Sequence, residues 1–211
     1  AMWTRHLPIY EEVIGSIRKG LIGEPKLVDA SLGFNAPYNH ESRLWNPKLA
    51  GGSLLDVGIY PLTLADLIYQ NTPESFFSLA ELSPEGVDAH VAITLQYANS
   101  ALATLRSAIN LSLTNGAIIV GESGSIEIPY FWCAQKAFIK QGSEQTEILR
   151  PHDINGFEYQ ILEMDRCLSE GLIQSPKVSW ECSLSMIQLM DSIRSQIGVS
   201  YQADDEENNG V

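Results

Sequence analysis

Apolar residues near both ends of the chain recur at the spacing of an amphipathic helix. Ile9, Val13 and Ile17 share one face of a segment that opens with Pro8, which predicts a helix over residues 8–19. The same periodicity predicts two further helices near the C-terminus, each followed by a glycine. These two helices cover residues 156–170 and 180–197.

Alternating apolar and polar residues dominate the middle of the chain. Over residues 91–97 every second residue is large and apolar, which predicts a strand with one face against a core. The opposite face carries Ala92, Thr94 and Gln96, so it is lightly charged and suits either solvent or an oligomer interface. Strands are predicted over residues 26–34, 75–82, 87–97, 101–110, 116–121, 125–129, 132–140 and 146–150.

A polar loop and a helical segment lie between the first two predicted strands. Residues 36–50 form the loop. Residues 51–69 are predicted to be helical although they contain Pro61, which kinks the helix or divides it into two pieces. The order of elements is then helix, strand, helix, many strands and two helices. That order predicts an α+β domain with a mainly antiparallel, open-faced sheet and helices packed on one face.

The composition is that of a globular protein with an acidic excess. Of the 211 residues, 45% are hydrophobic and 18% are charged, and the formal net charge is −13. Such a chain lacks the basic surface that nucleic acid or an anionic membrane needs, so neither is expected as a partner. Residues 1–201 are expected to form one domain, and residues 202–211 an acidic, disordered tail.

The cysteines and histidines do not indicate a metal site. Cys133, Cys167 and Cys182 are widely spaced, odd in number and outside any Cys/His cluster. This pattern favours reduced, mostly buried thiols in a cytoplasmic protein. No apolar run reaches the length of a membrane span, and no signal peptide precedes the first predicted helix.

The segment over residues 51–61 holds the most distinctive candidate chemistry. Two glycines open it, and Asp56 and Tyr60 stand four residues apart, which places an acid and a phenol on one face of a helix. Such a pair can move protons on a small hydroxylated substrate. The residues alone leave alternatives open. Tyr60 also fits a core tyrosine with a satisfied hydroxyl, and Asp56 fits a first-turn acid stabilised by the helix dipole.

Several motifs occur in an order that resembles a known family. They are Met2-Trp3-Thr4-Arg5, residues 51–61, Gly121-Glu122-Ser123-Gly124, Asn155-Gly156-Phe157, and Ser175-Pro176 with Ile197-Gly198-Val199. From Met2 to Tyr201 the chain resembles the C-terminal domain of the glucose–fructose oxidoreductase, inositol dehydrogenase and rhizopine catabolism (Gfo/Idh/MocA) family. Within that family it most resembles the dimeric dihydrodiol dehydrogenases, which also act as NADP-dependent D-xylose dehydrogenases. The resemblance implies a fold like the C-terminal domain of glyceraldehyde-3-phosphate dehydrogenase.

The resemblance also implies roles for individual residues. Tyr60 matches the proposed acid/base, which exchanges a proton with the substrate hydroxyl, and Asp56 matches the acidic residue one helical turn earlier. Trp3 and Trp132 match aromatic positions that line the substrate pocket, and Phe157 approaches that pocket. The resemblance therefore predicts a site with two catalytic residues and an aromatic wall.

The aromatic residues also have interpretations that involve no substrate contact. Without a further domain packed on it, Trp3 is a disordered terminal side chain. Trp132 has aromatic neighbours on its N-terminal side and fits a core position equally well. Of the four histidines, only His40, in the polar loop, is retained as a candidate substrate neighbour.

The resemblance places the cofactor outside this chain. Family members bind NAD(P) in an N-terminal Rossmann domain, which also supplies a lysine from a Glu-Lys-Pro motif beside the tyrosine. This chain contains neither Glu-Lys-Pro nor a Gly-x-Gly-x-x-Gly motif after a strand, and residues 121–124 are predicted to be a turn. No cofactor site is therefore expected within it. Met2 is then the start of a shortened reading frame after a vector-derived Ala1, or the chain is a cloned or cleaved domain.

Taken with its resemblance, the sequence predicts the substrate-binding and dimerisation domain of an NAD(P)-dependent oxidoreductase. Its substrate would be a CH–OH group of a small sugar or diol. The chain is expected to be inactive alone, because the nucleotide-binding domain is missing, and to form a homodimer through the open face of its sheet. The alternative is a non-catalytic dimerising or interaction module descended from such an enzyme.

Overall fold

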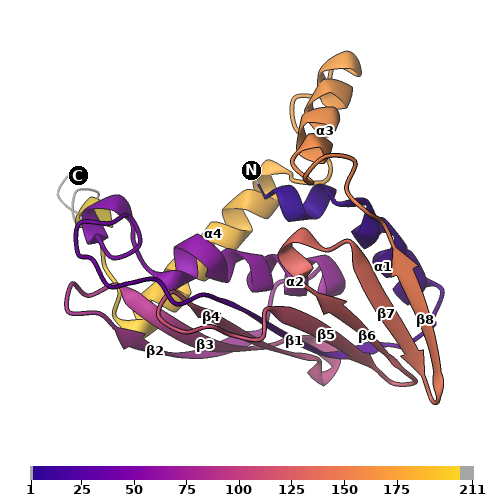
Figure 1. Cartoon of the computed structure of the whole chain (residues 1–211), viewed down its shortest axis with the longest axis horizontal. Helices are drawn as coiled ribbons and strands as arrows, with labels where there is room; N and C mark the ends of the chain where they lie inside the picture. The colour runs from indigo at the N-terminus through magenta and orange to yellow at the C-terminus, as the bar shows by residue number, and fades with distance from the viewer. Residues whose placement is uncertain (1, 205–211) are drawn as a thin grey trace.

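One mixed sheet runs the length of the molecule (Figure 1). The structure is a computed structural model and describes residues 2–204. Within them, eight strands pair in the order β2-β3-β4-β1-β5-β6-β7-β8. The strands are β1 (Pro25–Gly33), β2 (Ser75–Leu82), β3 (Asp88–Gln96), β4 (Leu102–Ala108), β5 (Gly116–Gly121), β6 (Ser125–Pro129), β7 (Lys136–Gln141) and β8 (Glu144–Leu149).

The central strand of the sheet, β1, joins two antiparallel halves. It pairs in parallel with β4 on one side and antiparallel with β5 on the other. All other neighbouring strands in the described sheet are antiparallel. The predicted α+β class with a mainly antiparallel, open-faced sheet is therefore confirmed.

Helices cover one face of the sheet and leave the other bare (Figure 1). On β3 the side chains of Val91, Ile93 and Leu95 are buried beneath the helices, whereas Ala92 and Thr94 face outward. This is the alternation predicted from the sequence. The helices are α1 (Pro8–Arg18), α2 (Ile59–Tyr69), α3 (Glu158–Ser169) and α4 (Trp180–Ile197).

Helix α3 stands away from the sheet (Figure 1). Its Ile161, Leu162 and Met164 are exposed, although their spacing predicts a face packed on a core. Along α4, Met190 and Ile193 are buried over the sheet, but Leu184 is exposed. Part of the apolar surface of both helices therefore lacks a covering layer in this chain.

The predicted strand over residues 132–140 begins later than expected. Tyr130 adopts a left-handed conformation with φ of 49°, and residues Phe131–Cys133 form a 3-10 turn before β7 starts. The turn drives Phe131 fully into the core, where its carbonyl oxygen accepts a hydrogen bond of 2.5 Å from the hydroxyl of Tyr10. A run of aromatic residues suits a buried turn as well as a strand, so periodicity did not separate the two.

Pro61 does not divide the predicted helical segment, which runs without a break over residues 53–69. A π-helical turn, η3 (Leu54–Gly58), leads directly into α2. Pro61 lies in the first turn of α2, where its missing N–H interrupts no hydrogen bond of the α-helical ladder. Such π turns often occur at functional sites.

The C-terminal segment after α4 packs on the polar loop. Trp45, Val199 and Tyr201 belong to a second buried cluster, separate from the main core. Asp204, which was assigned to the acidic tail, accepts hydrogen bonds from Arg194 and from the backbone of Tyr201. The rest of the predicted tail, residues 205–211, lies outside the described residues.

Strand β4 offers a matched test of the core. Leu105 is fully buried, whereas Leu102 on the same strand is 38% exposed. We expect Leu105→Ala to lower the free energy of unfolding by about 2–5 kcal/mol and Leu102→Ala by less than about 1 kcal/mol. Urea denaturation measures both values. Equal losses would contradict the assignment of the two faces.

Candidate functional site

The hydroxyl of Tyr60 is held by the first residues of the chain. Tyr60 lies half-buried in the first turn of α2. Trp3, in the 3-10 helix η1 (Trp3–His6), is 8% exposed, and its indole Nε1–H donates a hydrogen bond of 3.3 Å to the Tyr60 oxygen. The side chain of Arg5, also in η1, pairs with Asp66 of α2. Two polar contacts therefore fix η1 against the helix that carries Tyr60.

Trp3 also contacts the start of α3. Its ring lies 4.5 Å from that of Phe157 and 6.4 Å from that of His152, measured between centroids. Gly156 allows this contact because its φ is 93° and a Cβ atom there would lie 2.6 Å from the Trp3 ring. The structure thus brings together Tyr60, Trp3 and Phe157, and it adds His152, which lacked any sequence signal.

Asp56 has a different partner from Tyr60. It lies in the π turn η3, and its carboxylate accepts a charged hydrogen bond of 2.5 Å from Arg43 of the polar loop. The Asp56 side chain is 19% exposed and that of Arg43 is 67% exposed, so this ion pair borders solvent. Sequence reasoning placed Arg43 in the loop without assigning it a role, because only the folded loop brings it to Asp56.

The remaining two predicted site residues occupy different places. Trp132 is half-buried in the 3-10 turn after β6, and its carbonyl oxygen accepts a hydrogen bond of 2.7 Å from Thr4, next to Trp3. His40 is exposed in the polar loop. Trp132 is therefore linked to the segment that carries Trp3, whereas His40 lies in the exposed polar loop.

The glycines that open the helical segment accommodate a buried carboxylate. Asp88, the first residue of β3, is fully buried, and its Oδ2 accepts hydrogen bonds from the Leu54 backbone at 2.6 Å and from Ser53 at 2.8 Å. Burial raises the pKa of Asp88, and these hydrogen bonds oppose the shift. Gly52 has φ of 118°, and a Cβ atom there would overlap Asp88 Oδ1. Gly52 thus makes room for Asp88.

The two glycine-rich segments, at residues 51–54 and 121–124, do not fit the pyrophosphate of a dinucleotide. A phosphate site needs free backbone N–H groups at a helix start or in a glycine loop. Asp88 already accepts the Leu54 N–H at the start of η3. In the other glycine-rich turn, the backbone N–H groups of residues 121, 122 and 123 already donate to the carbonyls of Gly124, Glu24 and Ile22. Both segments are therefore filled by the chain itself.

The described residues contain no cluster of three metal-ligating side chains. No helix among residues 2–204 is both long and apolar enough to cross a membrane.

Cys133, Cys167 and Cys182 are free thiols, of which only Cys167 is buried. The expectation of mostly buried thiols is therefore wrong for the other two, which are half-buried.

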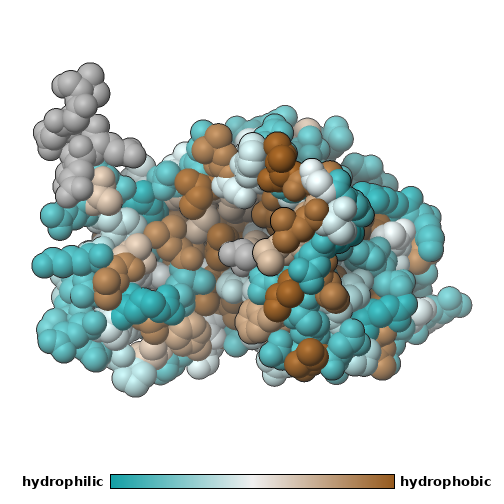
Figure 2. Space-filling model, turned by 90° about the horizontal axis from the view of Figure 1, so that it is seen from above, coloured by the Kyte–Doolittle hydropathy of each residue, from teal (hydrophilic) through white to brown (hydrophobic). Residues whose placement is uncertain are grey.

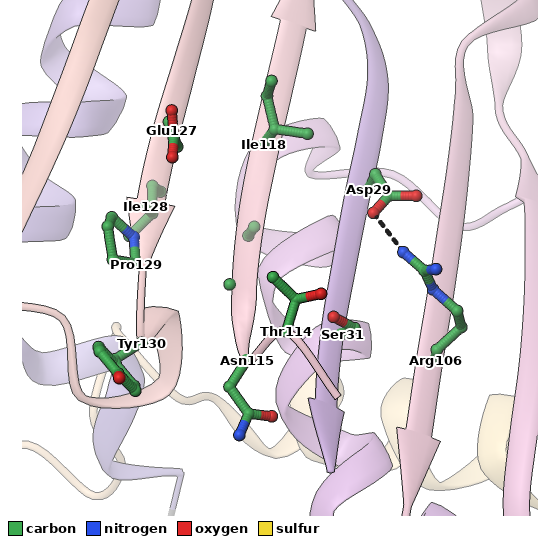
Figure 3. A pocket seen from close by; sticks show the side chains of 12 residues that line it. Asp29, Ser31, Arg106, Thr114, Asn115, Ile118, Glu127, Ile128, Pro129 and Tyr130 are labelled. Carbon is green, nitrogen blue, oxygen red and sulfur yellow. Dashed lines mark hydrogen bonds and ion pairs between the residues drawn. The ribbon is translucent and has the colours of Figure 1, made fainter. Parts of the chain in front are cut away.

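The bare face of the sheet carries a shallow polar hollow (Figure 3). Its volume is about 370 Å³, and strands β1, β4, β5 and β6 line it. On one side of the hollow, Arg106 of β4 pairs at 2.7 Å with Asp29 of the neighbouring β1, and Thr104 donates to the same carboxylate at 2.6 Å. The charges on this part of the face are therefore balanced across neighbouring strands.

The helical side of the molecule exposes a larger apolar surface. Figure 2 shows apolar side chains gathered on this side. A groove of about 560 Å³ runs between α3, η1 and the chain that follows α3. We call this area the helical apolar surface. It comprises the exposed Ile161, Met164, Leu168, Ile173, Trp180 and Leu184.

Sequence comparison identifies relatives of the chain. Residues 10–127 match the family model described as GFO/IDH/MocA C-terminal domain. The chain is 32% identical, over 95% of its length, to trans-1,2-dihydrobenzene-1,2-diol dehydrogenase of Xenopus laevis. It is 30% identical, over 98% of its length, to the enzyme of that name from Danio rerio. The chain spans 63–64% of the length of these two relatives.

Solved structures share the fold. An aldose-aldose oxidoreductase from Caulobacter crescentus, complexed with glycerol, superimposes with a TM-score of 0.81 at 23% identity over 92% of this chain and 59% of that chain. A 3-ketoreductase from Actinomadura kijaniata, in complex with NADP and TDP-benzene, gives a TM-score of 0.81 at 20% identity over 93% of this chain and 61% of that chain.

Two glycines test the contact between Trp3 and the start of α3. Gly156 and Gly171 both have positive φ, but only Gly156 has close neighbours. We expect Gly171→Ala to cost about 1–2 kcal/mol of stability from backbone strain, and Gly156→Ala about 1–3 kcal/mol more, because the new methyl displaces Trp3. Urea denaturation of the two variants gives the difference. Equal costs would show that Trp3 does not pack there.

Proposed function

The chain belongs to the GFO/IDH/MocA C-terminal domain family, and we propose that it is the substrate-binding and dimerisation domain of an NAD(P)-dependent oxidoreductase. The proposed substrate is a CH–OH group of a small sugar or diol. The two relatives are named as dehydrogenases of a dihydrobenzene diol, which supports this substrate class.

The contact between Trp3 and Tyr60 carries the proposal. An indole N–H can only donate, so the Tyr60 oxygen is the acceptor in the bond of 3.3 Å between them. The hydroxyl proton of Tyr60 is then free to be donated elsewhere. A phenol that is fixed in this way by Trp3, whose ring also contacts Phe157, can exchange a proton with a substrate hydroxyl at its Oη atom. We assign Tyr60 that role.

The other residues of the site supply shape and charge. Trp3 and Phe157 form an aromatic wall that suits the apolar face of a sugar or diol ring. Asp56 accepts from Arg43 at the solvent border, where its remaining acceptor capacity suits a second substrate hydroxyl. The hydrogen bond between Thr4 and the carbonyl of Trp132 ties Trp132 to the segment that carries Trp3.

The hydride carrier is proposed to come from a nucleotide-binding domain that packs on the helical apolar surface. Two observations support this. The relatives extend well beyond the length that this chain spans. The exposed apolar residues of α3 and α4, among them Leu168 and Trp180, form an uncovered patch of the kind that marks a protein interface. NAD(P), when bound there, supplies the redox step.

The bare sheet face is the proposed homodimer interface. Phe77 and Leu79 on β2 are 60% and 66% exposed and align through the strand register with Thr94 and Ala92. The ion pairs Asp29–Arg106 and Glu127–Lys140 balance the charge further along the sheet. The sheet face thus has an apolar edge on β2 and a centre whose charges are paired. A surface of this kind can pack against a second copy of itself.

A non-catalytic dimerising module is the second candidate function. Its supporting observation is the same sheet face, which does not depend on Tyr60 or on a cofactor. The two candidates differ in one respect: only the enzyme domain requires the proton-exchange chemistry of Tyr60.

We expect the chain alone to show no saturable binding of NADPH by tryptophan fluorescence. Joined to the nucleotide-binding domain of a relative, it should reduce NADP⁺ with a dihydrodiol or D-xylose as substrate. Tyr60→Phe should then lower kcat by about 10²–10⁴-fold, because it deletes the exchangeable proton. Tyr69→Phe, which removes a hydroxyl bonded to the Leu102 carbonyl, is the matched control. Full activity of Tyr60→Phe would contradict the assigned role.

We expect a dimer by light scattering at micromolar concentration. Leu79→Lys should yield monomers, because it places two charges against each other across the symmetric interface. Leu184→Lys changes an equally exposed leucine on the helical side and should leave the dimer intact. A monomeric parent chain, or a dimer that is lost only with Leu184→Lys, would refute the sheet-face interface.

A further inference from the structure

We propose that Asp88 is a positioning residue for the site, because its buried carboxylate fixes the helix start from which Asp56 and Tyr60 project. This inference rests on the proposed function of those two residues. Asp88 itself touches neither of them: its hydrogen bonds go to Ser53 and Leu54.

The Asp88 carboxylate accepts hydrogen bonds from the first residues of the helical segment. Asp88 Oδ2 accepts a hydrogen bond from the Leu54 N–H. This N–H is one of the donors that have no partner within the helix at its start. The same oxygen accepts from Ser53, whose Oγ lies 3.0 Å from the Oγ of Ser107 on β4. The helix start is thereby tied to two neighbouring strands, β3 and β4.

The C-terminal end of the π turn, at Gly58, also packs against β4. A Cβ atom on Gly58 would lie 3.0 Å from the Ser107 Oγ, so the backbone approaches β4 closely there. Ser53 and Gly58 therefore both rest on Ser107, and the turn between them has little freedom to rotate. Asp56 lies within this turn and Tyr60 two residues after it.

The surroundings of Asp88 keep its carboxylate in place. Its Oδ1 is buried and has no hydrogen-bond partner among the described residues. A buried carboxylate without a cation is costly unless donors and a helix start compensate for it. Both compensations come from residues 53 and 54. Displacement of the helix start would remove them together, so the carboxylate favours one position of the helix.

Two variants of the 211-residue chain test this inference by NMR. In Asp88→Asn, we expect the Leu54 amide to exchange with solvent about tenfold faster, as expected for a weakened helix cap. The Trp3 indole N–H and the Tyr60 ring signals should shift with it. Ser53→Ala removes one of the two donors and should move the same signals less.

Asp29→Asn is the matched control, because Asp29 also accepts two hydrogen bonds, here both from side chains, but faces the bare side of the sheet. It should leave the Trp3 and Tyr60 signals unchanged. If Asp88→Asn does not fold, Ser53→Ala decides the outcome. Unchanged Trp3 and Tyr60 signals in Ser53→Ala, despite faster Leu54 exchange, would overturn the positioning role.

Activity separates this inference from the function on which it rests. In the chain joined to a nucleotide-binding domain, Asp88→Asn should lower kcat about tenfold and change KM less than about twofold, because misplaced groups affect the reaction more than binding. A large rise in KM alone would overturn the positioning role. An inactive parent enzyme would instead refute the proposed function, and the NMR comparison would still decide the role of Asp88.

Discussion

The burial of Asp88 under the start of a helix is the constraint on which the site depends. A carboxylate in the core must find donors, and here they come from Ser53 and the Leu54 backbone. Gly52 has to lack a side chain to admit it. The same glycine pair is held from the other side, since Gly51 accepts from the Tyr201 hydroxyl at 2.6 Å and Gly52 donates to the Leu44 carbonyl at 2.9 Å. Sheet, polar loop, helix and C-terminal segment therefore meet at one point.

From that point the chain presents two surfaces with different physical characters. The bare sheet face pairs an apolar edge with balanced ion pairs, a combination suited to a symmetric contact. The helical side exposes long apolar residues on α3 and α4. Trp3 and Tyr60 lie on the helical side, where α2 covers the sheet. The proposed chemistry and the proposed nucleotide-binding partner thus occupy the same side, and the proposed dimer contact occupies the opposite one.

Much of the fold follows from local sequence patterns. The predictions that failed did so for two different physical reasons. The alternation over residues 91–97 identifies β3 and its buried face, because a strand repeats every two residues. Trp132 was assigned to the start of a strand, although it lies in a 3-10 turn, because apolar character does not report backbone dihedrals. The exposure of α3 was missed for a different reason. Helical periodicity identifies which face is apolar, but not whether the same chain covers that face.

The sequence by itself determined the class of fold, the family resemblance and the presence of an acid and a phenol on one helical segment. These depend on residue identity and short-range spacing. Only the tertiary structure decided the partners: Trp3 for Tyr60, Arg43 for Asp56, and Asp88 for the glycine-led helix start. Trp3 and Tyr60 are 57 residues apart, and Asp88 and Leu54 are 34 apart. Hydrogen bonds act over about 3 Å in space, and no periodicity in a sequence encodes which distant donor will fill that space.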